Sequence, residues 1–155
     1  MIELDAFVDA NPYFTADDVE RILEDLLGGT DEYEEIVLHV TMDEDLAGDR
    51  GGAVHSVDLE LREYGDARVH DAQVFICPNA CTSEQDVLET LCHELVHVKQ
   101  YVTGQLREDY SRIGFVWLER PWTYMFTPFD EVTVTSPWEV EAEREGLKLF
   151  AKYFA

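Results

Sequence analysis

Basic side chains are the scarcest charged groups in this chain of 155 residues. It has 11 Lys and Arg, three of them lysine, against 34 Asp and Glu, which gives a formal net charge of -23. Contacts with the phosphates of nucleic acids need clustered Lys and Arg. The composition therefore argues against direct binding to DNA or RNA. An acidic surface that keeps the protein hydrated in concentrated salt is the explanation we favour. The alternative is an acidic surface that mimics DNA.

Long apolar runs and paired cysteines are also missing. No stretch is apolar over the length that a membrane span needs, and Met1–Asp5 lacks the basic segment and apolar run of a secretory signal. The chain has three cysteines, an odd number that does not indicate a disulfide framework. We expect them to be buried free thiols, in a protein of a reducing cytoplasm that has no membrane partner.

The chain length fits one domain, residues 1–155, with a core large enough to need no disulfides. Hydrophobic patterns and capping residues predict helices at about 15–28, 83–103 and 137–154 and strands at 35–42, 54–61 and 72–77. An aromatic hairpin is predicted between residues 114 and 126. We expect an α+β domain, with a small, mostly antiparallel sheet and two helices that carry the functional residues.

The most informative motif is His93-Glu94-Leu95-Val96-His97. Two histidines four positions apart lie on one face of a helix, about one turn from each other, and suit two ligands of one tetrahedral Zn²⁺. The glutamate between them can reach a metal-bound water as a general base. A chain of this composition would contain the pattern by chance only roughly 0.02 times.

The helix predicted around the motif has a clear beginning, a buried face and an end. Ser83 and Asp86 form a variant of the capping box, and Gly104 is a natural stop. The histidines lie beside the apolar stripe, which places them at the edge of the core. Residues of this stripe recur every three or four positions: Val87, Leu88, Leu91, Leu95, Val98 and Val102.

A third ligand is expected at the start of the last helix, where Ser136 can cap and Pro137 fits the first turn. Two glutamates compete for this role. Glu141 shares a face with residues of alternating charge, which is typical of a solvated surface. Glu139 shares a face with small and apolar residues that let one helix approach another. We therefore predict Glu139 as the ligand, with Glu141 as the alternative.

These motifs resemble those of the gluzincins, zinc peptidases that combine HExxH with a glutamate from a downstream helix. The resemblance extends over about residues 72–150, and this stretch also looks like the small single-domain zincins encoded by tailed viruses and prophages. It implies a zincin-like domain and Zn²⁺ bound by His93, His97 and Glu139. It also places Glu143, where the family usually has Asp, near a zinc-binding histidine. No histidine follows the motif, unlike in metzincins. The lysine-poor composition resembles proteins of halophilic archaea and their viruses.

The resemblance also implies a mechanism. Glu94 acts as the general base, and a second donor stabilises the oxyanion. We choose Tyr124 for that donor over Tyr110 and Tyr101. The strand at 72–77, before the motif helix, is the candidate for pairing with an extended substrate.

The expected function is a zinc metallopeptidase, an endopeptidase acting on protein or peptide substrates in the cytoplasm of a host cell or in association with a virion. Two alternatives stay open. One is a catalytically inactive zinc-binding zincin with a structural or partner-binding role. The other is an acidic, DNA-mimic-like binding protein in which the motif is incidental.

Overall fold

A computed structural model describes residues 2–29, 34–43, 55–64, 67–109, 114–123 and 136–155. Three α-helices and two small sheets make up these residues, so the expected α+β class is confirmed. The helices are α1 (Ala16–Leu27), α2 (Glu84–Val102) and α4 (Pro137–Tyr153), with a short 3-10 turn, η1 (Pro78–Ala80). The strands are β1 (Ile2–Val8), β2 (Glu34–Met42), β3 (His55–Tyr64), β4 (Ala67–Ile76), β5 (Leu106–Asp109), β6 (Gly114–Trp117) and β7 (Arg120–Thr123).

The larger sheet corrects the prediction of a mostly antiparallel arrangement. Its strand order is β1-β2-β4-β3. The pairs β1–β2 and β2–β4 are parallel, and β3–β4 is antiparallel. Two features account for the difference. Strand β3 lies between β2 and β4 in the sequence but at the edge of the sheet, so β2 and β4 are neighbours and run parallel. Strand β1, which was not predicted, adds the second parallel pair. A strand, a helix and a second strand in succession form a crossover that makes the two strands parallel, as β1, α1 and β2 do.

The order of strands also corrects the predicted substrate-pairing strand. The segment 72–77 belongs largely to β4, which pairs with β2 on one side and β3 on the other. Both backbone edges of β4 are therefore used, and an extended peptide has no free edge there to join. Within the described part of the chain, β3 pairs with β4 alone and is the edge strand on that side.

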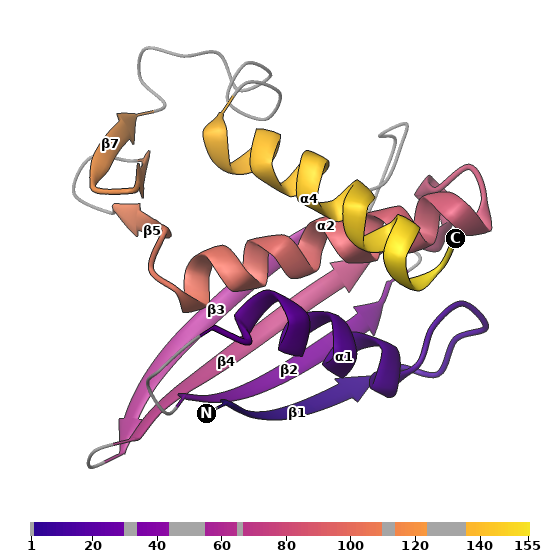
Figure 1. The fold of residues 1–155 in the computed structure, drawn as a ribbon, viewed down its shortest axis with the longest axis horizontal. Coiled ribbons are helices and arrows are strands. Elements are labelled where there is room, and N and C mark those ends of the chain that lie inside the picture. Colours follow the sequence, from indigo (N-terminus) through magenta and orange to yellow (C-terminus); the bar gives the residue numbers. More distant parts are fainter. Residues whose placement is uncertain (1, 30–33, 44–54, 65–66, 110–113, 124–135) are drawn as a thin grey trace.

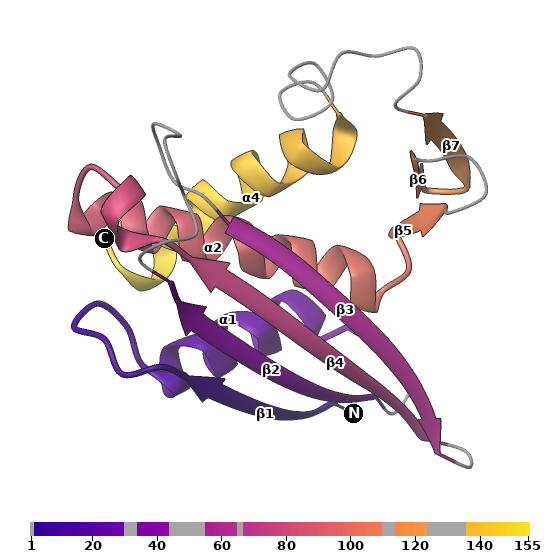
Figure 2. The same cartoon turned by 180° about the vertical axis from the view of Figure 1, so that it is seen from behind.

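All three helices lie on one face of this sheet, as the two opposite views show (Figure 1, Figure 2). The side chains of β2 and β4 alternate accordingly, with Ile36, Leu38, Ala72 and Val74 buried under the helices. On the other face, Phe7 stacks on its register partner His39 with ring centroids 5.1 Å apart. Among the described residues, no helix is long and apolar enough to cross a membrane.

The local signals around α2 act much as predicted. Ser83 caps the helix by accepting a hydrogen bond from the Asp86 amide at 3.1 Å. The Asp86 carboxylate accepts from the amide of Thr82 at 2.9 Å instead of from Ser83, so the capping box is displaced by one residue. At the other end, Gly104 follows the helix in the left-handed region, with φ of 77°. All six residues of the predicted apolar stripe are buried.

The smaller sheet confirms part of the predicted hairpin and extends it. Strands β6 and β7 pair antiparallel, and β5, which was not predicted, adds on the other side of β6. Leu118 and Glu119, the two residues of the turn, both have positive φ, as this tight kind of turn requires. Beside this sheet, Trp138 from the first turn of α4 packs with Trp117 and Leu106 in a second apolar cluster.

Candidate metal centre

Helix α2 holds the motif in the middle of the protein. The sheet, α1 and α4 all pack around it. Glu94 is completely buried, His97 is 5 % exposed, and the side chain of His93 keeps 13 % of its surface. A buried carboxylate and two nearly buried imidazoles on one helix thus form a polar cluster in an apolar interior. Such groups need one another, or an ion, to replace the water they have lost.

Helix α4 runs antiparallel to α2 and comes unusually close to it (Figure 1). The reason lies in two small residues, Ala142 and Gly146, which are both buried against α2. A β-carbon added at Gly146 would lie only 3.0 Å from the backbone nitrogen of His93. This contact confirms the expectation that small residues let the two helices approach, and it brings Glu139, two turns earlier, over the histidines.

Four possible ligand atoms from the two helices converge at one point: the Nε2 atoms of two histidines and both carboxylate oxygens of one glutamate. The Nε2 atom of His93 lies 3.0 Å from Oε2 of Glu139, and the Nε2 atom of His97 lies 3.1 Å from Oε1. The two Nε2 atoms are 3.2 Å apart. The structure thus brings together the three residues that were predicted as ligands, although they are up to 46 positions apart in the sequence.

The spacing of these atoms fits a small tetrahedral metal ion. Ligand atoms about 2.0–2.1 Å from a tetrahedral zinc are about 3.3 Å from one another. The separations observed here are 3.0 and 3.1 Å from the two Nε2 atoms to the nearer Glu139 oxygen, a different oxygen for each ring, and 3.2 Å between the Nε2 atoms. A set of two imidazoles and one carboxylate with room for one further ligand is also the donor set of catalytic zinc sites. The residues present therefore fit Zn²⁺.

The outer nitrogens of both rings also have acceptors. Nδ1 of His97 lies 2.8 Å from Oε1 of Gln100. Nδ1 of His93 lies 3.5 Å from the carboxylate of Glu143, at ion-pair distance. A neutral ring that carries its proton on Nδ1 satisfies each contact and turns the lone pair of Nε2 inward. Partners of this kind orient histidine ligands in metal sites.

The electrostatics of the cluster favour a positive charge at its centre. Burial alone would lower the pKa of His97, but the adjacent Glu139 and Glu94 carboxylates outweigh it and raise the pKa to about 9. Burial would raise the pKa of Glu139, yet hydrogen bonds to both imidazoles hold it far below its usual range. A proton supplies this charge when no ion does, and a divalent cation can take the same place.

Glu94, predicted as the general base, lies beside these converging atoms. Its Oε1 atom is 3.9 Å from Nε2 of His93. Together, His93, Glu94 and His97 offer ligand atoms within 4.8 Å of one another. The carboxylate is thus too far away for a direct hydrogen bond to the ring, and near enough to reach a small molecule held at the centre.

The alternative ligand, Glu141, makes other contacts. Its carboxylate accepts from Gln100 Nε2 at 3.3 Å and pairs with Lys99 at 3.4 Å. It is not the solvated side chain that the charge pattern of α4 indicated, because these contacts hold it against α2. Among the tyrosines considered for the oxyanion, Tyr124 and Tyr110 lie outside the described residues. Tyr101 packs at the edge of the second apolar cluster.

The remaining candidate residues have structural surroundings. None of the three cysteines, all of which the structure describes, forms a disulfide bond; Cys77 and Cys92 are buried, as expected, whereas Cys81 is partly exposed. Burial, with a smaller effect of Glu89, raises the pKa of Cys92 to about 12, so this thiol beside His93 stays protonated. His39 is exposed and His70 is buried in the larger sheet.

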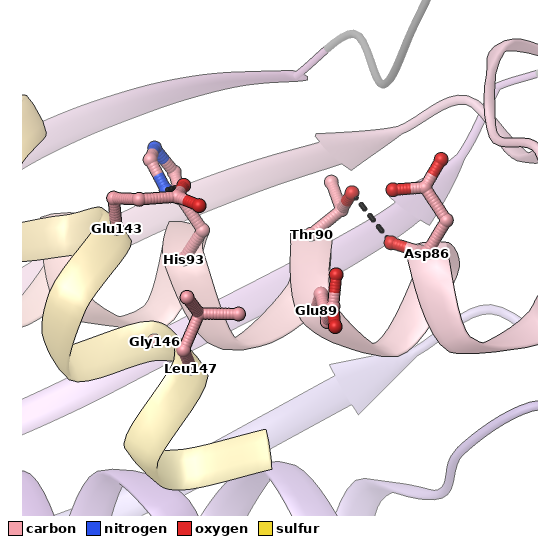
Figure 3. Close-up of a pocket in the computed structure, with 7 residues that line it drawn as sticks. All are labelled: Asp86, Glu89, Thr90, His93, Glu143, Gly146 and Leu147. Carbon is pink, nitrogen blue, oxygen red and sulfur yellow. Dashed lines mark hydrogen bonds and ion pairs between the residues drawn. The ribbon is translucent and has the colours of Figure 1, made fainter. Parts of the chain in front are cut away.

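A pocket of about 180 Å³ opens between α2 and α4, next to His93 (Figure 3). Glu143 reaches from α4 toward His93 at one end, and Asp86 and Glu89 stand on α2 at the other. Three carboxylates in so small a pocket give it a negative potential, which attracts cations and basic groups. Thr90 uses its hydroxyl in a 2.7 Å bond to the Asp86 carbonyl.

Gln100, which contacts His97 Nδ1, is a residue of the site that no sequence motif indicated. The signal was present, since a residue three positions after His97 on a helix lies next to it.

Comparison with protein-family models, curated proteins and solved structures finds no match for the chain.

Proposed function

We propose that this protein is a zinc-dependent metallopeptidase, with His93, His97 and Glu139 as the ligands. The observation that carries the proposal is the convergence of both Nε2 atoms and the two carboxylate oxygens of Glu139, with separations of 3.0, 3.1 and 3.2 Å, and with Glu94 Oε1 at 3.9 Å from His93 Nε2. Lone pairs of three side chains that face one another repel unless a cation or protons lie between them. A catalytic zinc site satisfies them and explains the nearby buried base.

Zinc supplies Lewis-acid chemistry, because it polarises a carbonyl group and lowers the pKa of water. The protein residues hold and move the proton. Glu94 accepts a proton from the attacking water as oxygen adds to the peptide carbonyl carbon. When the bond between that carbon and nitrogen breaks, Glu94 returns the proton to the leaving amine. Its complete burial excludes bulk water that would compete for the proton.

An extended peptide is the substrate class we propose. Strand β3, at the edge of the larger sheet and in contact with α2, takes the place that the sequence analysis gave to residues 72–77. A peptide that pairs with β3 would be held by main-chain hydrogen bonds, which do not depend on its sequence.

The first test is the metal content of the wild type, Glu139→Ala and Glu141→Ala, measured by mass spectrometry on protein purified without chelator. We expect about one zinc per chain in the wild type and in Glu141→Ala, and none in Glu139→Ala. The two variants remove the same group from the same helix, two positions apart, so each controls for the other. A wild type that neither holds nor rebinds zinc would overturn the proposal.

The second test separates an enzyme from an inactive metal-binding protein. Zinc-loaded wild type and Glu94→Gln are incubated with a mixture of unstructured peptides, and the products are identified by mass spectrometry. Glu94→Gln preserves the size of the buried side chain and removes the base, so we expect full zinc content and at least a 10²-fold loss of cleavage. Equal cleavage, or none by the wild type, would favour the structural or partner-binding role.

A further inference from the structure

Gln100 lies at the junction of the two helices that supply the proposed ligands. Gln100 belongs to α2, and its side chain is completely buried. It contacts His97 on its own helix, and Trp138 and Glu141 on α4. A buried primary amide is costly unless its hydrogen-bonding capacity is used. Both ends of the Gln100 amide form hydrogen bonds. One bond is to the proposed ligand His97, and the others are to the residues on either side of Glu139 in the first turns of α4.

The contacts of Gln100 fix which way round its amide lies. Its Nε2 atom faces two acceptors, the backbone carbonyl of Trp138 at 3.0 Å and the Glu141 carboxylate at 3.3 Å. Only the NH₂ end can donate to both. The carbonyl end therefore faces Nδ1 of His97, at 2.8 Å. An amide oxygen can only accept, so Nδ1 must carry a proton, which directs the lone pair of Nε2 toward the centre.

The same amide also fixes the second helix. Trp138 directly precedes Glu139, and its carbonyl belongs to the first turn of α4. The hydrogen bond from Gln100 to that carbonyl fixes the distance between the first turn of α4 and α2. Gln100 therefore relates the ring of His97 to the backbone that carries Glu139, through two bonds from one rigid planar group.

We propose that Gln100 is a positioning residue of the metal centre, which sets the orientation of His97 and docks the Glu139 turn in one step. This inference rests on the proposed function. It predicts that loss of the amide weakens zinc binding while all three ligands remain. Second-sphere partners of metal ligands typically contribute 10- to 100-fold to metal affinity.

The experiment measures zinc dissociation constants by competition with a chelator for the wild type, Gln100→Met and Gln85→Met. Methionine matches glutamine in length and removes all three hydrogen bonds. Gln85 lies on the same helix, exposed, and bonds Glu89, so Gln85→Met is the matched control. We expect Gln100→Met to bind zinc 10- to 100-fold more weakly, and Gln85→Met to bind it as the wild type does.

A second readout distinguishes positioning from a purely structural role. In the zinc-loaded wild type, NMR should show a slowly exchanging proton on His97 Nδ1, and Gln100→Met should lose it. Gln100→Glu keeps an acceptor for Nδ1 but repels Glu141, so it should keep this proton and still bind zinc more weakly. The double variant Gln100→Glu with Glu141→Gln again has one amide donor and one carboxylate acceptor at this contact, so it should recover part of the zinc affinity. If Gln100→Met does not fold, the Glu variant provides the comparison.

Unchanged zinc affinity in Gln100→Met, or weaker affinity with the Nδ1 proton still protected, would overturn the positioning role and leave the proposed function intact. A wild type that binds no zinc would overturn the proposed function, and this inference with it.

Discussion

At the scale of single residues, two imidazoles and the carboxylates of Glu139 and Glu94 determine the behaviour of the site. His97 combines near-complete burial with a pKa raised to about 9, because Glu139 and Glu94 lie next to it. The metal-free protein therefore carries a proton on His97 at neutral pH, at the place where the proposed zinc would bind. Zinc and the proton compete for one nitrogen.

This competition gives a pH dependence with a definite sign. Below pH 9 zinc must displace the proton of His97, so we expect the apparent affinity to fall about tenfold per unit as the pH is lowered from 8.5 to 7. Competition with a chelator in zinc-buffered solution measures this slope. An affinity that does not change over that range would show that His97 is not a ligand.

The same proton affects the metal-free fold in the opposite direction. Because the folded pKa of His97 is raised, the stability it contributes is complete below the unfolded value of about 6.5. That contribution is lost as the pH rises through about 9. We expect the metal-free protein to become less stable to denaturant between pH 7 and 9.5, and His97→Gln to show a smaller change. An equal change in both would assign the loss to another group.

At the scale of elements, the separation of α2 and α4 decides whether the ligands meet. Gly146 sets this separation, since a β-carbon there would lie 3.0 Å and 3.1 Å from two backbone atoms of His93. Backbone atoms in the middle of a helix cannot move aside alone. A bulkier residue at this position must displace one helix relative to the other.

Gly146→Ala therefore tests the close approach. Alanine in a helix interior ordinarily gains about 1 kcal/mol over glycine, whereas overpacking costs about 1–3 kcal/mol. We expect a net loss of about 1 kcal/mol in the free energy of unfolding, with weaker zinc binding. Gly29→Ala is the control, because a β-carbon there meets nothing within 4 Å. If Gly146→Ala instead has a higher free energy of unfolding than the wild type, the two helices move apart at little energetic cost.

The elements also show which features could be predicted from the sequence. Helices α2 and α4 and their ends follow from local signals, such as Ser83, Gly104 and Pro137. The meeting of Glu139 with His93 could be anticipated because the small residues of α4 share its face. The parallel sheet could not, because β2 pairs with β4 although β3 lies between them in the sequence, and because the partner of the short strand β1 lies beyond a helix. The partners of Glu141 were missed because Lys99 and Gln100 belong to another helix.

At the scale of the whole molecule, the net charge of -23 is the dominant feature. Like charges on a compact protein repel one another, and dissolved salt shortens the range of this repulsion from about 10 Å at 0.1 M to about 3 Å at 1 M. The pocket beside His93, with three carboxylates, shows that this charge extends into the groove between the helices.

Screening should therefore stabilise the fold. We expect the free energy of unfolding to rise as NaCl is increased from 0.1 to 1 M, and to rise less in sucrose of equal osmolality. Urea titrations at each salt concentration measure the difference. Equal effects of salt and sucrose would point to exclusion of the cosolvent from the surface as the cause, and would count against adaptation to concentrated salt.

The distance along the chain between the ligands has one more consequence. His93 and Glu139 are 46 positions apart, so an ion that joins them closes a long loop, as a crosslink would. Closing such a loop removes conformational freedom from the unfolded chain, as a disulfide does. Docking of α4 and binding of the ion would then be coupled, so that each favours the other. A binding partner that displaced α4 would release the metal, and one that clamped α4 would tighten it. Metal occupancy would thus report on the last helix of the chain.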